Sequence, residues 1–89
     1  MKDYPKLNQA IANVLKARRE ELNLSKRKLS ELACLERVYL IQLEKGEKRP
    51  TVNALFYISE ALGMKPSETM KMIEEERERL ERDDSHNLH

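Results

Sequence analysis

Two short amphipathic segments with almost no chain between them constrain this sequence more than any other feature. The first covers about residues 26–33 and the second about residues 36–45, so that only Cys34 and Leu35 remain to connect them. Helical spacing places apolar residues on one face of each segment, namely Leu29, Leu32 and Ala33 in the first and Leu40 and Leu43 in the second. Two helices joined so tightly cannot pack side by side and antiparallel. We therefore expect them to cross steeply, in the geometry of a helix-turn-helix motif.

The length and composition of the chain suit one small domain with a modest core. A hydrophobic fraction of 39% and a single Phe fit a helical bundle better than a β-sandwich. No apolar run is long enough for a membrane span, and the start MKDYPKLNQA lacks the apolar stretch of a signal peptide. The single cysteine, Cys34, cannot form an intramolecular disulfide, which favours a cytoplasmic location.

Five helices and no strand are expected along the chain. Apolar spacing predicts them over about residues 6–22, 26–33, 36–45, 52–62 and 66–82. Ser25 and Thr51 are expected to cap two of the helix N-termini, and Gly46 and Gly63 to follow two of the C-termini. We therefore predict an all-α, compact five-helix bundle with an extended C-terminal helix and a disordered tail over residues 83–89.

The net charge of +1 conceals an uneven distribution of charge along the chain. Residues 1–50 hold twelve Lys and Arg against seven Asp and Glu, whereas residues 51–89 hold five against nine. This separation predicts a basic face suited to phosphate and an acidic region turned away from it. Ordinary scatter of surface charge is the alternative explanation.

A resemblance to a known family extends from Ile11 to Gly63 without gaps. The residues that carry it are Arg19, Leu24–Ser25, Leu29, Ala33, Leu35, Arg37, Tyr39, Leu40, Leu43, Glu44, Gly46, Pro50–Thr51, Leu55 and Ala61–Gly63. In this pattern the chain resembles the Cro/phage-repressor-like helix-turn-helix family of bacterial and phage regulators. The resemblance implies a domain, residues 1–82, that binds double-stranded operator DNA as a homodimer, with the motif itself at residues 25–45.

The resemblance also implies an ion pair between Arg19 and Glu44, which would tie the first helix to the end of the third. The residue types agree with it, because a helix macrodipole disfavours an acid near the C-terminus unless a cation compensates. The alternative is that both charges are solvated.

Two positions depart from the family pattern. Cys34 stands where the family usually has Gly, and Ser30 stands where it usually has Ala. A side chain at a turn position that needs φ > 0 costs ~1–2 kcal/mol, so the sequence predicts either strain or a different turn at Cys34. We expect Cys34 to be a small buried apolar side chain, and a redox-sensing role is the alternative.

The outer face of the third helix is expected to enter the DNA major groove. The candidates for reading bases are Glu36, Arg37, Val38, Ile41 and Gln42. Arg37 can donate two hydrogen bonds to guanine, and Gln42 can pair with adenine. The β-branched Val38 and Ile41 suit contact with thymine methyl groups. Glu36 can accept a hydrogen bond from cytosine, or it can stabilise the helix N-terminus instead.

A basic rim is expected to hold DNA phosphates on both sides of the third helix. Lys26, Arg27 and Lys28 fall in the first turn of the second helix, where the macrodipole disfavours each cation by ~0.3–1 kcal/mol. A phosphate bound there would make the cations favourable, because the free N–H groups and the cations attract the same anion. The purely structural alternative is that Glu31 pairs with Arg27 and partly compensates the cluster. The complete phosphate-contacting set is Ser25, Lys26, Arg27, Lys28, Tyr39, Lys45, Lys48 and Arg49.

The dimer surface is expected in the C-terminal half of the chain. A symmetric dimer would place two reading helices about one DNA turn apart, ~34 Å. The last helix could instead be held in water by its own pairs, Glu75–Arg79 and Glu78–Arg82. The candidate dimer residues are Met64, Met70, Ile73 and Leu80.

These features together predict a dimeric transcription regulator, either a repressor or an autoregulator of the controller-protein type. The alternative is an antitoxin of a toxin-antitoxin pair, which binds a partner protein through its C-terminal half and autoregulates its operon. No catalytic set can be assembled, because His86 and His89 lie in the polar tail and the acids are spread over helix surfaces. No cofactor or metal site is expected, since no Cys/His cluster has zinc spacing.

Overall fold

The computed structural model describes residues 1–87, and within that range it contains five helices and no strand. The helices are α1 (Leu7–Glu21), α2 (Lys26–Leu32), α3 (Arg37–Glu44), α4 (Val52–Ala61) and α5 (Pro66–Asn87). The predicted all-α fold is confirmed, and each end of the first four helices lies within one residue of its expected position.

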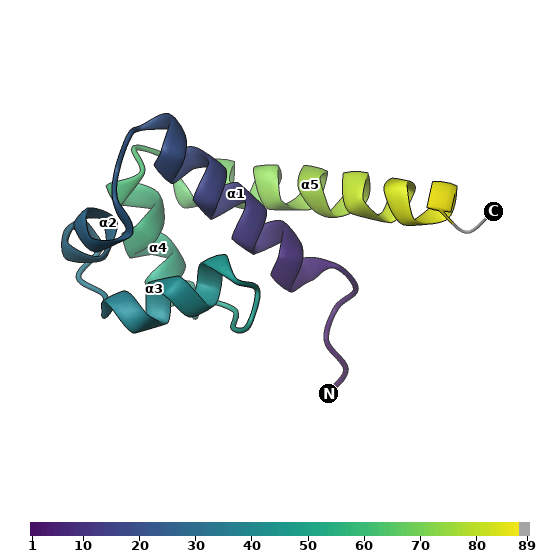
Figure 1. Ribbon diagram of the computed structural model, residues 1–89, viewed down its shortest axis with the longest axis horizontal. Helices are drawn as coiled ribbons and strands as arrows, with labels where there is room; N and C mark the ends of the chain where they lie inside the picture. Colours follow the sequence, from purple (N-terminus) through teal and green to yellow (C-terminus); the bar gives the residue numbers. More distant parts are fainter. Residues whose placement is uncertain (88–89) are drawn as a thin grey trace.

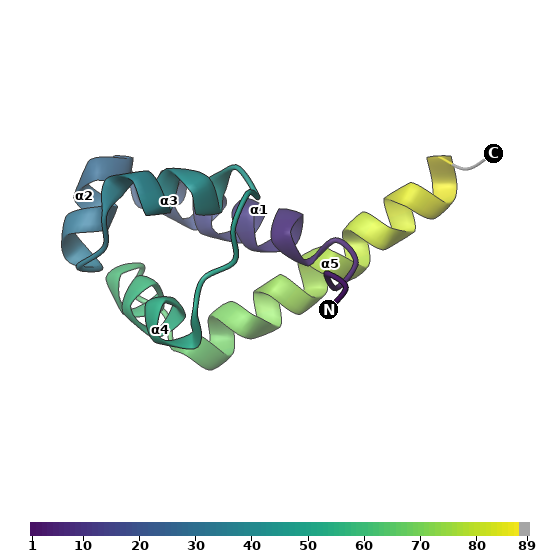
Figure 2. The same cartoon turned by 90° about the horizontal axis from the view of Figure 1, so that it is seen from below.

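The helices α2 and α3 cross steeply, as their short connection requires. In Figure 1, α2 is seen almost end-on while α3 lies across the view below it. The helix α1 packs against α3 and α5, and α4 packs against α2 and α5. These contacts hold α3 at one side of the bundle, away from the extended end of α5 (Figures 1 and 2).

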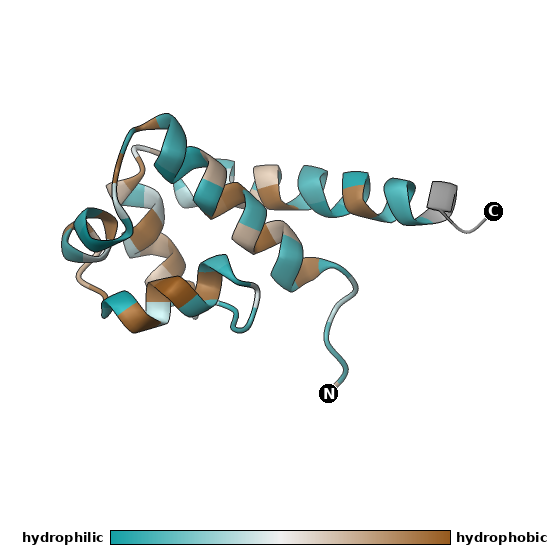
Figure 3. Ribbon diagram, in the orientation of Figure 1, coloured by the Kyte–Doolittle hydropathy of each residue, from teal (hydrophilic) through white to brown (hydrophobic). Residues whose placement is uncertain are grey.

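The core lies where the inward faces of all five helices meet. Leu15, Leu40 and Leu43 are fully buried in it, as are Ile58 and Leu62. Figure 3 shows the corresponding hydrophobic bands on α1, α3 and α4, and the largely hydrophilic outer turns of α5. The helix–helix contacts that fix α3 are therefore mainly apolar.

Short polar side chains define where two of the helices begin. Ser25 Oγ accepts a hydrogen bond from the Lys28 amide at 2.9 Å, and Thr51 Oγ1 accepts one from the Ala54 amide at 3.0 Å. Such N-caps are worth ~1 kcal/mol each. After α3, Gly46 adopts φ +75°, and this left-handed residue lets the chain turn away from the helix end.

The last helix is longer than the sequence predicted. Residues 83–87, expected in a disordered tail, are helical, and residues 88–89 lie outside the described part of the chain. Arg79 pairs with Glu76 and with Asp83, at 2.8 Å in both cases, in place of the expected partner Glu75. Pairs at i,i+3 and i,i+4 stabilise a solvated helix, which explains why α5 continues past Arg82.

Two apolar residues occupy positions that differ from expectation. Leu32 was expected on the inward face of α2, but it is 48% exposed, because the fully buried Leu29 and Ala33 define that face and Leu32 lies to one side of it. Ile73, a candidate for the dimer surface, is only 2% exposed and belongs to the core.

The described helices include none with the length and apolar character needed to span a membrane.

Candidate nucleic-acid interface

An ion pair between α1 and α3 positions the exposed helix of the motif. Arg19 Nε and Nη2 donate to the two carboxylate oxygens of Glu44 at 2.7 and 2.9 Å. Arg19 Nη1 also donates to the Leu24 carbonyl oxygen at 2.8 Å. The hydrogen bond to Glu44 raises the pKa of Arg19, against the opposing effect of burial. The pair therefore fastens the C-terminal end of α3 to α1 and to the chain that leads into α2.

The outer face of α3 carries the five residues proposed from sequence to read bases. Glu36 and Arg37 are exposed at its N-terminal end, and Val38 is 64% exposed. Ile41 and Gln42 are half-buried on the following turn. The exposed side chain of Val38 is available for an apolar contact, such as one with a thymine methyl group.

The N-terminus of α3 leaves backbone donors free. Glu36 is the N-cap residue, and no side chain in the described part of the chain hydrogen-bonds to the first amides of the helix. The Glu36 side chain thus does not cap the helix by a hydrogen bond, although its negative charge interacts favourably with the positive N-terminal end of the helix dipole. Free amides at a helix N-terminus suit a phosphate or other anion.

A shallow hollow of about 540 Å³ runs along this side of the motif. It brings together the turn, the exposed side of α3 and a cation of the following loop. Its lining residues are Cys34, Leu35, Glu36, Val38, Tyr39, Gln42 and Lys48. Three of the proposed base-reading residues therefore share one concave surface with two of the proposed phosphate contacts.

Cys34 is exposed, which contradicts the expectation that it is buried. Its φ of +56° is the left-handed conformation anticipated at this turn. In that conformation the backbone carries the chain from α2 into α3 while the side chain points outward. Cys34 and its neighbour Leu35 thereby line the hollow, a position that their residue types did not reveal.

The first turn of α2 presents a cluster of exposed cations, Lys26, Arg27 and Lys28, with no acid in that turn. Arg27 Nε lies 3.2 Å from Glu31 Oε1, so one of the three cations has the partner within the chain that the structural alternative requires. A second hollow, of about 270 Å³, is lined by Ser25, Arg27, Lys28 and Glu31.

The other proposed phosphate contacts follow the end of α3. Lys45, Lys48 and Arg49 are exposed, and Tyr39 is half-buried with its hydroxyl accepting a hydrogen bond from the Thr51 amide at 3.3 Å. Arg49 Nη1 lies 2.8 Å from Asp3 Oδ1. Within the residues whose side chains are described, ion pairs engage Arg27 and Arg49 but none of the other cations proposed for this rim.

A family model for the helix-turn-helix matches residues 15–68, which cover the second half of α1, the motif, α4 and the start of α5. The chain belongs to the helix-turn-helix family. A helix-turn-helix protein of this type is a DNA-binding transcriptional regulator, and the exposed α3 is the element that such proteins place against DNA.

Two solved structures of another helix-turn-helix protein share the fold. Both are crystal structures of the clp gene regulator ClgR from Corynebacterium glutamicum. One matches with a TM-score of 0.83 and 22% identity, covering 97% of this chain and 93% of that chain. The other matches with a TM-score of 0.74 and 23% identity, covering 86% of this chain and 99% of that chain. No curated protein matches the chain.

Acidic, histidine and cysteine side chains do not gather into a metal site in the described part of this helix-turn-helix protein. The two hollows of the motif are lined by cations, an amide, hydroxyl and apolar groups, and by one acid each, Glu36 and Glu31. The cations and the amide suit recognition of DNA phosphates and base edges.

Proposed function

We propose that this regulator binds double-stranded operator DNA as a homodimer and represses transcription, including that of its own gene. The observation that carries the proposal is the exposed N-terminal half of α3, where Arg37 and Val38 project beside a hollow that also holds Gln42. Cations before and after the motif would hold the phosphates on either side of the groove entered by α3.

The proposal divides the interface into two sets of contacts. Glu36, Arg37, Val38, Ile41 and Gln42 read base edges, because the outer face of α3 carries them. The phosphate set supplies affinity and register without reading sequence. It comprises Ser25, Lys26, Arg27, Lys28, Tyr39, Lys45, Lys48 and Arg49, all within residues 1–82, which we propose as the DNA-binding domain.

The homodimer surface is proposed on the apolar face shared by α4 and α5. Val52, Phe56 and Met70 are 73%, 54% and 45% exposed, which is costly for large apolar side chains in water. Beside them lies an apolar cavity of about 190 Å³, lined by Leu7, Ile11, Arg49, Pro50, Val52, Leu55, Met70 and Ile73. A closed cavity of ~150 Å³ can hold a benzene ring, and we propose Phe56 of a second copy as the occupant of this one.

This location revises the set of dimer candidates from sequence. Of that set, Met70 stays in the proposal, because it is exposed beside the cavity. Met64 and Leu80 are only partly buried but pack against the core, and Ile73 lies at the bottom of the cavity. A two-fold interface needs the same patch on both copies, and this face carries both a protruding ring and a cavity.

An antitoxin role is the second candidate function. The observation that favours it is the end of α5, which projects from the bundle and carries seven acids against three bases over residues 74–84. Such a helix suits a basic partner protein. Co-expression with the product of the adjacent gene would separate the two candidates, since only an antitoxin would co-purify with a small basic protein at fixed stoichiometry.

Selection of bound duplexes from a random pool tests the main proposal. We expect an enriched sequence with two inverted half-sites about one turn apart, ~34 Å between centres. A single enriched half-site would contradict the dimer, and a pool without enrichment would contradict sequence-specific binding.

A further inference from the structure

We infer that residues 3–6 form an N-terminal latch that competes with DNA phosphate for Arg49. The inference rests on the proposed DNA-binding function and adds a form of regulation to it. Asp3 Oδ1 accepts a hydrogen bond from Arg49 Nη1 at 2.8 Å. Arg49 belongs to the basic rim after α3, so the chain's own carboxylate occupies a guanidinium that a phosphate would use.

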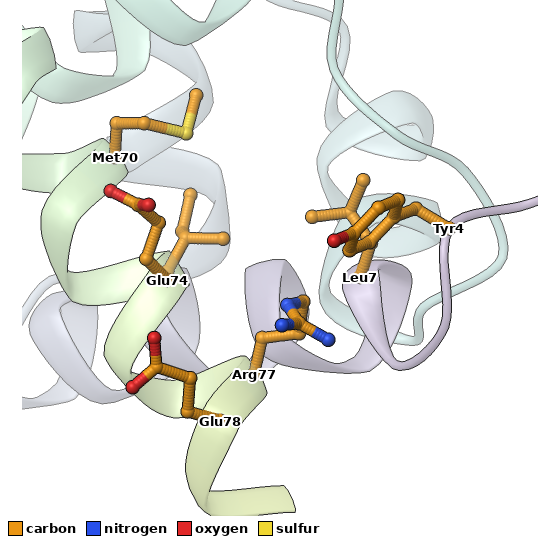
Figure 4. A pocket seen from close by; sticks show the side chains of 7 residues that line it. Tyr4, Leu7, Met70, Glu74, Arg77 and Glu78 are labelled. Atoms are coloured by element: carbon orange, nitrogen blue, oxygen red, sulfur yellow. The ribbon is translucent and has the colours of Figure 1, made fainter. Parts of the chain in front are cut away.

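Two more contacts attach the latch to α5, in the half of that helix that lies farther from the motif. The Tyr4 ring lies against the guanidinium of Arg77, with 4.9 Å between Arg77 Cζ and the ring centroid. Lys6 forms an ion pair with Asp84 on α5. Figure 4 shows Tyr4 and Leu7 facing Arg77 across a pocket that also carries Glu74 and Glu78. One short segment therefore joins Arg49 to the outer half of α5.

At Lys6 the backbone of the latch has the left-handed conformation, which residues other than glycine rarely adopt. Lys6 has φ +63°, and the Leu7 amide donates to the Tyr4 carbonyl at 3.2 Å. A left-handed lysine persists only where its surroundings hold it, and here Asp3, Tyr4 and Lys6 itself supply the contacts. Loss of one contact thus favours release of the whole segment.

DNA binding and the closed latch compete at Arg49. The Asp3 carboxylate offsets part of the guanidinium charge through its bond to Nη1 and repels a phosphate that approaches the remaining N–H groups, so the bond to Asp3 weakens phosphate binding. Binding of DNA would open the latch, and the closed latch would weaken DNA binding. The side chains of Arg49 and Asp3 are 43% and 70% exposed, so the effect on affinity is modest, roughly two- to five-fold.

A double-mutant cycle on the full chain tests the latch. The probe is a mixed-sequence duplex long enough for two half-sites, titrated at low salt, where phosphate contacts dominate the affinity. The variants are Asp3→Asn, Arg49→Gln and the double substitution. Glu47→Gln is the matched control, because it removes an exposed acid from the same loop without touching Arg49.

We expect Asp3→Asn to tighten binding about two- to five-fold and to steepen the salt dependence, and we expect Arg49→Gln to weaken binding. In the Arg49→Gln background, the gain from Asp3→Asn should fall to that of removing any exposed acid, no larger than the gain from Glu47→Gln, which should be the same in both backgrounds. Equal gains from Asp3→Asn in both backgrounds would overturn the latch and leave DNA binding intact. Unchanged affinity in Arg49→Gln would overturn the phosphate contact and the latch together.

Hydrogen exchange gives a readout that does not depend on affinity. The Leu7 amide, which is bonded to Tyr4, should exchange faster in Asp3→Asn and in the DNA complex of the unmodified chain. Unchanged protection of that amide when DNA binds would overturn the opening of the latch.

Discussion

Arg19 and Glu44 face each other with two parallel hydrogen bonds, at 2.7 and 2.9 Å, although they lie on different helices. Their side chains are only 10% and 2% exposed. A bidentate arginine–carboxylate pair fixes orientation as well as distance. Because Glu44 is the last residue of α3, the pair holds that helix at a defined angle to α1 and so determines how α3 is presented.

Loss of one partner from this pair should destabilise the protein strongly. We expect Glu44→Ala to lower the free energy of unfolding by ~3–5 kcal/mol, because Arg19 would remain buried without a counter-charge. The measurement is urea denaturation followed by circular dichroism. Glu21→Ala is the matched control, since it breaks the exposed pair with Arg18 and should cost less than ~1 kcal/mol. Equal losses in the two variants would contradict the structural role of the buried pair.

Relief of backbone strain at the turn should stabilise the protein. Cys34 has φ +56°, and its exposed side chain loses little packing when it is removed. Cys34→Gly should gain ~1–2 kcal/mol from the turn and lose ~0.4–1 kcal/mol to the more flexible unfolded chain, a net gain of about 1 kcal/mol. Cys34→Ala keeps the Cβ atom and should gain nothing. A gain in the alanine variant equal to that in the glycine variant would contradict strain as the cause.

Local signals in the sequence were sufficient to predict most of the fold. Ser25 and Thr51 cap the helices expected to begin after them, and both Gly46 and Gly63 have positive φ. Each of these features depends on a few neighbouring residues. The helix boundaries could therefore be predicted without knowledge of tertiary contacts.

Features that depend on tertiary contacts were predicted less well. Ile73 falls on an apolar stripe, and periodicity alone cannot tell whether that stripe meets the core or a second copy. The extension of α5 depends on Arg79 bridging Glu76 and Asp83, where several pairings were possible. The contact of Asp3 with Arg49 joins residues far apart in the sequence and had no local signal.

The two kinds of DNA contact should respond differently to substitution. Arg37→Ala should cost ~1–3 kcal/mol on the selected operator and little on random DNA, because a base contact is lost. Lys28→Ala should weaken binding to both and flatten the salt dependence, because a phosphate contact is lost. Fluorescence titration of each variant with both duplexes makes the comparison. Identical behaviour of the two variants would contradict the proposed division between base and phosphate contacts.

Acid should weaken the contact between α1 and α5. Hydrogen bonds from Arg79 lower the pKa of Glu76, burial opposes this, and a hydrogen bond from Asn13 Nδ2 at 2.7 Å adds to the lowering. The folded pKa lies below the ordinary value of 4.5, so the contribution to stability is complete above that pH and is lost as pH falls through the folded value.

Urea denaturation over a range of pH checks this assignment. Glu76→Gln should make stability less dependent on pH below 4.5, because the titrating group is gone. Glu75→Gln, which removes the adjacent exposed carboxylate, is the control and should leave the profile closer to that of the unmodified chain. A profile for Glu76→Gln that coincides with the unmodified chain would contradict the role of this carboxylate.

Phe56 should control dimer formation. If its ring enters the apolar cavity of a second copy, two-fold symmetry buries two rings at once. Burial of one large apolar side chain contributes ~1.5–3 kcal/mol, so Phe56→Asp should cost ~3 kcal/mol or more in dimerisation free energy. Sedimentation equilibrium should show a dimer for the unmodified chain and a monomer for the variant. Because Phe56 is half exposed, circular dichroism should show an unchanged fold.

Met72→Asp is the matched control for that substitution. Met72 is 41% exposed and lies on another face of α5, beside Glu75, Glu76, Arg79 and Arg82. The same change of an exposed apolar residue to an acid there should leave the dimer intact. A dimer that survives Phe56→Asp but dissociates in Met72→Asp would move the interface to that face of α5. Because dimerisation sets the spacing of two α3 helices, only the variant that dissociates should also lose preference for paired half-sites.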